Sequence, residues 1–186
     1  MEALHIAGLK QHHAEAFKKI MFTKTLSKKE YLIQEGTVCN FIGIVASGTL
    51  RSYLQNNKEE FNNDFYFDNH FISAYTSFLT QKPTKSTIQA LTDVEIHYIT
   101  YDQFNELIEQ DVTWLKLAKY ISDSFFIRKC RRESSFLKNT AAERLESVLS
   151  LYPGIEQKIS QYHIASYLGI KPESLSRIKL LTYINK

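Results

Sequence analysis

The feature that most constrains the fold is a long stretch of sequence without helix breakers. No glycine occurs between Thr49 and Pro153, and no proline occurs between Thr84 and Tyr152. Glycine and proline are the residues that most disfavour a helix interior. A long helix is therefore permitted, and the apolar pattern predicts it from about residue 111 to residue 136.

The predicted long helix carries an apolar stripe whose members recur in steps of four, three and four. They are Trp114, Ala118, Ile121 and Phe125. A broad apolar stripe must be buried, either against the chain's own sheets or against a second copy of the helix. We predict that these four residues form the interface of a homodimer, with packing on the chain's own barrel as the alternative.

A different pattern precedes the helix. Short apolar, β-branched or aromatic segments alternate with polar turns at 41–45, 49–54, 61–67, 71–75, 86–90 and 94–100. Several strands at about ten-residue spacing are typical of a small antiparallel barrel or sandwich. Residues 2–22 are helical in their spacing. The fold class is therefore predicted as α+β, with an antiparallel β-roll first and helices after it.

Composition excludes several classes of protein. The two cysteines, Cys39 and Cys130, are too few for a disulfide framework or for a cluster held by four thiolates. No apolar run is long enough to span a membrane, and the N-terminus lacks the pattern of a secretory signal, so we expect a cytoplasmic protein without a membrane partner. The sequence shows no cluster of metal-binding residues and no set of catalytic residues at a known spacing. We therefore predict no metal site, no catalytic residue and no enzymatic activity.

Positive charge is concentrated in the last quarter of the chain. Residues 138–186 hold seven Lys/Arg against four Asp/Glu, whereas the whole chain has a net charge of +3. The excess cationic charge therefore lies in this segment. Such an asymmetry indicates an anionic partner there, and double-stranded DNA is the leading candidate.

The same segment has the local signals of a helix-turn-helix. Thr140 is a predicted N-cap, with Glu143 completing a capping box, and Ser160 is a predicted cap for a later short helix. Gly169 suits the positive φ of a helix end, and Pro172 suits the first position of the next helix. The residues predicted to face inward are Ile164, Ala165, Leu168, Leu175, Ile178 and Leu181.

The outward residues of the second short helix are polar, small or basic. In a major groove, Arg177 suits a guanine and Glu173 suits the amino group of a cytosine. Phosphate contacts, which position the protein, are predicted for Tyr162, Ser174, Ser176 and Lys179, and Lys171 is the remaining predicted DNA-binding residue.

Because of these residues and motifs, nearly the whole chain resembles the Crp/Fnr family of bacterial transcription regulators. The most specific matches are the Ser47-Gly48 turn within 42–51 and the stretch 168–178, and Gly36 matches an earlier family glycine. The resemblance implies a cyclic-nucleotide-binding-type β-roll, a dimerisation helix, a C-terminal helix-turn-helix that binds promoter DNA, and contact with RNA polymerase.

The resemblance also places an effector pocket, and there the chain departs from the family. Ser73-Ala74 stands where nucleotide-binding members have Gly-Glu, and Lys85-Ser86-Thr87 stands where they have Arg-Ser-Ala. Ala74 has no acceptor for a ribose hydroxyl, and Lys85 lacks the planar fork of arginine. The predicted pocket residues are Ser73, Ala74, Tyr75, Lys85, Ser86 and Thr87. We therefore expect no binding of cyclic AMP, and no cofactor is predicted beyond an unidentified small-molecule effector.

A second departure concerns the reading helix itself, where Pro172 stands at a position that is often arginine in DNA-reading members. The domains are predicted as 1–110 (β-roll with an N-terminal helix), 111–137 (dimerisation helix) and 138–186 (helix-turn-helix without a full wing). The predicted function is a dimeric DNA-binding transcription regulator. The alternative is a β-roll sensor that acts through a protein partner without touching DNA.

Overall fold

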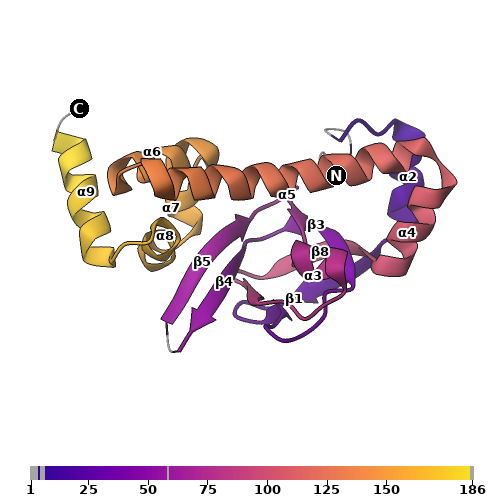
Figure 1. Cartoon of the computed structure of the whole chain (residues 1–186), viewed down its shortest axis with the longest axis horizontal. Coiled ribbons are helices and arrows are strands. Elements are labelled where there is room, and N and C mark those ends of the chain that lie inside the picture. The colour runs from indigo at the N-terminus through magenta and orange to yellow at the C-terminus, as the bar shows by residue number, and fades with distance from the viewer. Residues whose placement is uncertain (1–3, 5–6, 58, 185–186) are drawn as a thin grey trace. The chain divides into compact units, whose positions relative to one another are not determined.

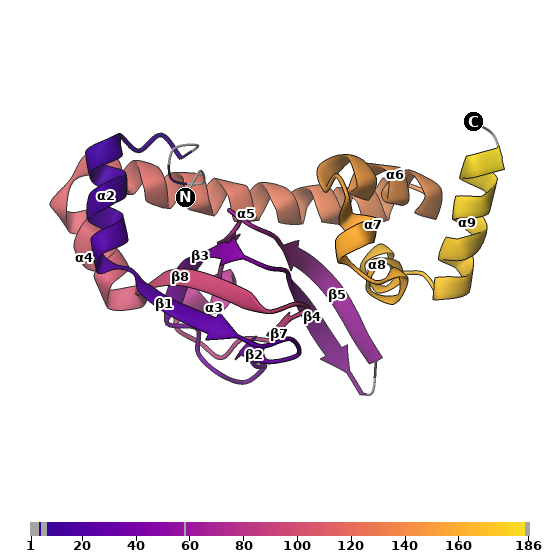
Figure 2. The same ribbon diagram turned by 180° about the vertical axis from the view of Figure 1, so that it is seen from behind.

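The computed structural model describes residues 4, 7–57 and 59–184 (Figures 1 and 2). The strands are β1 Phe22–Leu26, β2 Tyr31–Ile33, β3 Phe41–Ser47, β4 Leu50–Asn56, β5 Glu59–Tyr66, β6 Phe71–Ile72, β7 Ser86–Ala90 and β8 Val94–Thr100. The helices are α2 Gln11–Ile20, α3 Tyr75–Thr80, α4 Tyr101–Gln110, α5 Val112–Lys138, α6 Ala141–Leu151, α7 Ile155–Lys158, α8 Gln161–Leu168 and α9 Pro172–Ile184. The predicted α+β class is confirmed.

The chain divides into two compact units. The first unit contains residues 1–52 and 65–127, and the second contains residues 53–64 and 128–186. The second unit thus joins the tip of the β4–β5 hairpin to the end of α5 and the helices after it. The predicted domains, with boundaries at residues 110 and 137, are parts expected to fold independently, which is a different property from compactness. These boundaries stay a prediction.

Two four-stranded sheets form the β-roll. Their strand orders are β1-β8-β3-β6 and β2-β7-β4-β5, and β1 lies beside β8 in Figure 2. Both sheets contribute to one apolar core, which contains Ile44 and Ile96 from the first sheet and Leu50 and Ile88 from the second. These four side chains are at most 1% exposed, and the same core includes side chains of helices α2 and α5, so it is shared by the sheets and the helices.

The predicted strands at 86–90 and 94–100 are confirmed at their stated ends, as β7 and β8. Two strands were missed, β1 and β2, because β1 has four exposed residues of five and β2 is only three residues long. The strand predicted at 71–75 ends at Ile72, and Tyr75 begins helix α3 instead. The helix predicted at 2–22 is shorter, since α2 covers Gln11–Ile20 and β1 begins at Phe22; its first residues lie partly outside the described part.

The predicted Ser47-Gly48 turn links β3 to β4 and depends on glycine. Gly48 has a φ of +99°, and a Cβ atom at this position would lie 2.4 Å from the carbonyl oxygen of Asp93. Only glycine adopts this backbone conformation without strain and tolerates this close approach. The turn therefore explains why this position of the β-roll requires glycine.

Helix α5 confirms the predicted long helix, but its stripe is used differently from the prediction. Trp114, Ile121 and Phe125 are 6%, 0% and 5% exposed, and all three belong to the core of the first unit. Ala118 is half-buried against the same core. Trp114 packs against Phe17 of α2, and the Phe125 ring stacks on Tyr75 of α3, so elements of the same chain already cover the three buried side chains. Within residues 7–57 and 59–184, none of the helices has the length and hydrophobicity that a membrane-spanning segment needs.

Candidate nucleic-acid interface

The second unit contains the predicted pair of short helices, α8 and α9. Ser160 caps α8, since its hydroxyl accepts a hydrogen bond from the backbone N–H of His163. Gly169 follows α8 with a φ of +68°. The N–H of Gly169 donates to the Ser166 carbonyl, and the N–H of Ile170 donates to the Ala165 carbonyl, both at 3.1 Å. This pair of bonds is a Schellman motif, which ends a helix on a left-handed glycine.

The side of the two helices that faces the unit's interior is apolar, as predicted for four of the six inward residues. Ile164, Ala165, Leu168 and Leu175 are at most 1% exposed. Ile178 is half-buried. Leu181 is 58% exposed, so its predicted inward position is wrong.

The opposite face of α9 is exposed and carries the predicted reading residues. Glu173, Ser176 and Arg177 are exposed, and their spacing of three and four residues places them on one face of the helix. Lys171, just before the helix, is also exposed, whereas Ser174 is half-buried. Tyr162 on α8 is 56% exposed. Recognition helices of helix-turn-helix proteins contact base edges through residues near their N-terminal end.

Lys179 differs from the prediction. Its side chain is only 16% exposed, and its ammonium forms an ion pair with Glu156 of α7. Lys179 lies one turn after the buried Leu175, so it is on the inward flank of α9 and not on the exposed face. The structure therefore brings together Lys171, Glu173, Ser176 and Arg177, and it separates Lys179 from them.

A polar network that was missed from the sequence fixes α8 to strand β5. Asn62 is 0% exposed, and its side-chain amide donates to the His163 carbonyl at 3.1 Å. The backbone N–H of Asn62 donates to the Ser166 hydroxyl at 3.0 Å, and that hydroxyl donates to the Glu60 carbonyl at 2.8 Å. Every one of these bonds joins the hairpin to the first helix of the pair.

Two arginines hold the C-terminal end of α8. Arg132 donates to the carbonyls of Asn62 and Tyr167, each at 3.2 Å. Arg144 donates to the Leu168 carbonyl at 3.2 Å. The last carbonyls of a helix carry partial negative charge, so cations at this end are favourable. The position of α8, and through the tight turn that of α9, is thus set by charged contacts as well as by the apolar core.

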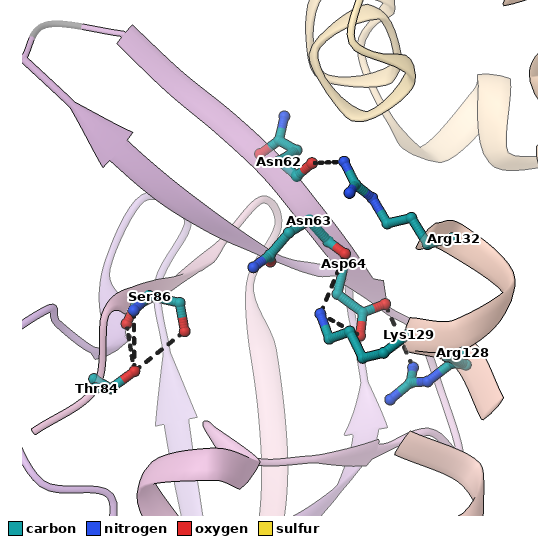
Figure 3. A network of polar contacts seen from close by, with 8 residues as sticks. All are labelled: Asn62, Asn63, Asp64, Thr84, Ser86, Arg128, Lys129 and Arg132. Carbon is teal, nitrogen blue, oxygen red and sulfur yellow. Dashed lines mark hydrogen bonds and ion pairs between the residues drawn. The ribbon is translucent and has the colours of Figure 1, made fainter. Parts of the chain in front are cut away.

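Asp64 lies at the base of the same network. Its carboxylate is 4% exposed and lies 3.6 Å from the Arg128 guanidinium and 4.0 Å from the Lys129 ammonium. Figure 3 shows both cations reaching from α5 toward this carboxylate on β5. A sequence signal existed, since Asn62 and Asp64 alternate with period two in a predicted strand. Nothing in the sequence identified the cations that they contact.

The two tyrosines beside this network are held neutral. Burial raises the pKa of Tyr167 to about 12, and the Asp64 carboxylate acts in the same direction. Burial also raises the pKa of Tyr152 well above its usual range, again with support from Asp64. Both effects follow from the cost of placing a phenolate in a poorly solvated site near a carboxylate.

The shift at Tyr167 predicts a loss of stability at alkaline pH. An unfolded tyrosine titrates near pH 10, so it releases its proton before the folded one does. The stabilisation is therefore present below pH 10 and is lost as the pH rises toward 12. In this pH range we expect the unfolding free energy of Tyr167→Phe to fall less steeply with pH than that of the wild-type protein. The difference in slope should be on the order of 1 kcal/mol per pH unit. Urea unfolding at a series of pH values above 9 measures this, and identical slopes in both proteins would contradict it.

The predicted effector-pocket residues lie in the first unit, and several are engaged internally. The Ser73 hydroxyl, 2% exposed, donates to the Phe41 carbonyl at 3.0 Å. The Tyr75 ring stacks on Phe125 with centroids 4.6 Å apart. The Thr87 hydroxyl accepts from the backbone N–H of Glu35 at 3.1 Å. The remaining three positions are Ala74, which is buried, Ser86, which is half-buried, and Lys85, which is exposed.

Comparison with known proteins agrees with this architecture. Residues 23–111 match the family model described as cyclic nucleotide-binding domain. No curated protein matches the sequence closely enough to count as a relative.

Solved structures match nearly the whole chain. The structure of FixK2 from Bradyrhizobium japonicum has a TM-score of 0.76 at 16% identity, over 89% of this chain and 86% of that one. The c-di-GMP-responsive global regulator CLP from Xanthomonas campestris has a TM-score of 0.73 at 15% identity, over 95% and 93%. A structure described as a transcriptional regulator of the crp/fnr family, from Eubacterium rectale, has a TM-score of 0.71 at 19% identity, over 96% and 85%. Residues 23–111 therefore match a cyclic nucleotide-binding domain, and the chain shares its fold with these solved structures, one of which is described as a regulator of the crp/fnr family.

Proposed function

We propose that the chain is a transcription regulator of the Crp/Fnr type that binds double-stranded DNA through α9 as a homodimer in the cytoplasm. The observation that carries this proposal is the exposed face of α9, where Glu173, Ser176 and Arg177 stand free of the core while Leu175 anchors the helix. The fold shared with a regulator of the crp/fnr family supports it. Contact with RNA polymerase, which the family resemblance implies, stays a prediction.

The salt dependence of binding tests this function against the protein-partner alternative. Contacts with several phosphates release counterions, so the affinity for a DNA duplex should fall steeply between about 50 and 200 mM salt. A protein interface of mixed polarity lacks such a dependence. Retention of DNA fragments whose affinity is insensitive to salt, or no retention at all, would favour the sensor that acts through a protein partner.

A dimer would use a face of α5 other than the buried stripe. Leu115 and Phe126 are 50% and 69% exposed. They are eleven residues apart, which is about three helical turns, so they share one side of the helix. Cys130 follows Phe126 by one turn and is half-buried. Large apolar side chains on one exposed helix face are typical of a helix–helix interface.

We expect Phe126→Glu to weaken dimerisation at least tenfold. A large central apolar side chain at an interface commonly contributes 2 kcal/mol or more, and a carboxylate in its place would be buried without a partner. Sedimentation velocity over a concentration series measures the change. Leu79→Glu, at a leucine of α3 that is 56% exposed, is the matched control and should leave the dimer intact. A monomeric wild-type protein at tens of micromolar would contradict the proposed dimer.

We also propose that the effector site does not accept cyclic AMP. Ala74 offers only a methyl group, the Ser73 hydroxyl is bonded to the Phe41 carbonyl, and Lys85 lacks a planar fork. Loss of one buried charge-assisted contact typically costs about 2–5 kcal/mol.

The expected result is an unchanged melting temperature in about 1 mM cyclic AMP. A site with a Kd of about 10 μM would be stabilised by about 2.7 kcal/mol at this concentration. For a chain of this size, that corresponds to roughly 5–10 °C. A shift of that size in a thermal unfolding scan would show that the pocket still binds the nucleotide.

A further inference from the structure

A cleft with a volume of about 360 Å³ opens in the first unit between two edge strands, β1 and β2. Its walls include Lys24 of β1, Tyr31 of β2, Val38 of the following loop, Phe41 of β3 and Tyr98 of β8. None of the predicted effector-pocket residues lines it. The cleft is therefore separate from the position where the family resemblance places an effector.

The strand register shows that Lys24, although its own side chain is exposed, lies on the same face of the sheet as buried apolar residues. Lys24 pairs with Ile96, and two residues later Leu26 pairs with Val94. Directly paired residues of antiparallel strands point to the same face of the sheet. Ile96 is 0% and Val94 is 4% exposed, so this face is the one that covers the core. A lysine thus stands where the alternation of the strand calls for an apolar residue.

Around this lysine the cleft is aromatic and carries no negative charge. The Tyr98 ring lies 5.6 Å from the Phe22 ring and 5.9 Å from the Phe41 ring, between centroids. Tyr31 and Val38 are 45% and 43% exposed at the rim. No acidic residue is among the described residues that line the cleft. The cleft therefore combines aromatic and aliphatic walls with the polar side chains of Gln34, Thr37 and Asn40 and with one cationic group, Lys24.

We propose that this cleft binds a small organic anion with an apolar body, whose carboxylate pairs with Lys24 and whose body packs against Tyr98 and Phe41. The volume falls in the usual range of small-molecule sites, which are mostly apolar with a few convergent polar groups. Charge complementarity selects an anion over a neutral or cationic ligand. The proposal concerns binding to the β-roll alone and does not depend on DNA binding.

The competing explanation is that Lys24 only protects an edge strand. Charged side chains at inward positions of edge strands deter pairing with another chain. This explanation requires no ligand. The two roles are distinguishable because only a binding site discriminates between an anion and its neutral analogue.

The test compares 2-naphthoate with 2-naphthamide as probes of the full-length protein by isothermal calorimetry. We expect the carboxylate to bind at least tenfold more tightly than the amide. Lys24→Gln should remove this preference, while Lys28→Gln, in the turn after β1 and outside the lining of the cleft, should keep it. Lys24→Glu should abolish binding of the carboxylate.

Amide chemical shifts locate the bound probe in the same samples. We expect 2-naphthoate to perturb β1, β2 and residues 34–41, with the spectra of the unliganded variants showing that each is folded. Equal affinity for acid and amide, an unchanged affinity in Lys24→Gln, shifts elsewhere on the chain, or no binding at millimolar probe would each overturn the proposal.

Discussion

Replacing Asp64 with alanine is expected to lower the free energy of unfolding of the second unit by about 3 kcal/mol. The Asp64 carboxylate is 4% exposed, and the Arg128 side chain that faces it is 18% exposed. Removing one partner of a buried ion pair leaves the other charge desolvated and uncompensated, which is the costly way to break such a pair. In this network the cost is increased because Lys129 and Arg132 remain close by.

The state of Arg132 supports this expectation. Burial lowers the pKa of Arg132, whereas the Asp64 carboxylate acts to raise it. The protein therefore bears a desolvation cost at this arginine that Asp64 partly offsets. Without the carboxylate, Lys129 would keep the repulsion of its neighbours Arg128 and Arg132 on α5 and lose the attraction of Asp64 that opposes it.

Asp123→Ala is the matched control for Asp64→Ala. Asp123 is an acidic residue of α5 that pairs with Lys119 one turn away, and both side chains are at least half exposed. Exposed pairs of this kind contribute about 0.3–0.5 kcal/mol. Urea unfolding followed by circular dichroism measures both variants. A cost for Asp64→Ala no larger than that for Asp123→Ala would show that the network does not stabilise the second unit.

Arg177→Ala is expected to weaken binding to the preferred DNA sequence by about 1–3 kcal/mol, which is roughly 5- to 150-fold. The Arg177 side chain is exposed on the same face of α9 as Glu173, and a guanidinium can contact a guanine through two hydrogen bonds. Such a contact contributes to discrimination between bases, so the loss should be largest for the preferred sequence and small for unrelated DNA.

Two other variants separate base reading from simple charge. Arg131→Ala removes the same charge from an exposed residue of α5, and we expect it to leave sequence preference unchanged. Lys171→Ala should weaken binding to all sequences about equally and reduce the slope of affinity against salt by about one ion. Fluorescence anisotropy with matched and scrambled duplexes measures all three variants. Equal losses for Arg177→Ala and Arg131→Ala would contradict a reading role for Arg177.

The helix-turn-helix could be predicted from the sequence because its signals are local. Ser160, Gly169 and Pro172 each act within one turn of chain, through a cap, a left-handed helix end and a first helical position. The capping box of Thr140 and Glu143 was predicted for the same reason and is present. Such signals do not depend on distant parts of the chain.

The features that were missed depend on distant parts of the chain. Strand β1 is mostly exposed and pairs with residues more than sixty positions away, as Leu26 does with Val94, so its own sequence carries little signal. The apolar stripe of α5 has the same spacing whether it packs on the β-roll or on a second helix. The roles of Asn62 and Asp64 depend on their contacts with α8 and α5. No local sequence pattern predicts that these elements pack together.

The most direct test of the central claim, that α9 reads DNA, is to sequence the DNA fragments retained from a random pool by the wild-type protein and by Arg177→Ala. We expect the wild-type protein to enrich two related half-sites whose centres are about 10 base pairs apart, one turn of the duplex. We expect Arg177→Ala to lose the enrichment at a guanine position in each half-site. A wild-type pool without any enriched motif, or the same motif in both pools, would contradict it.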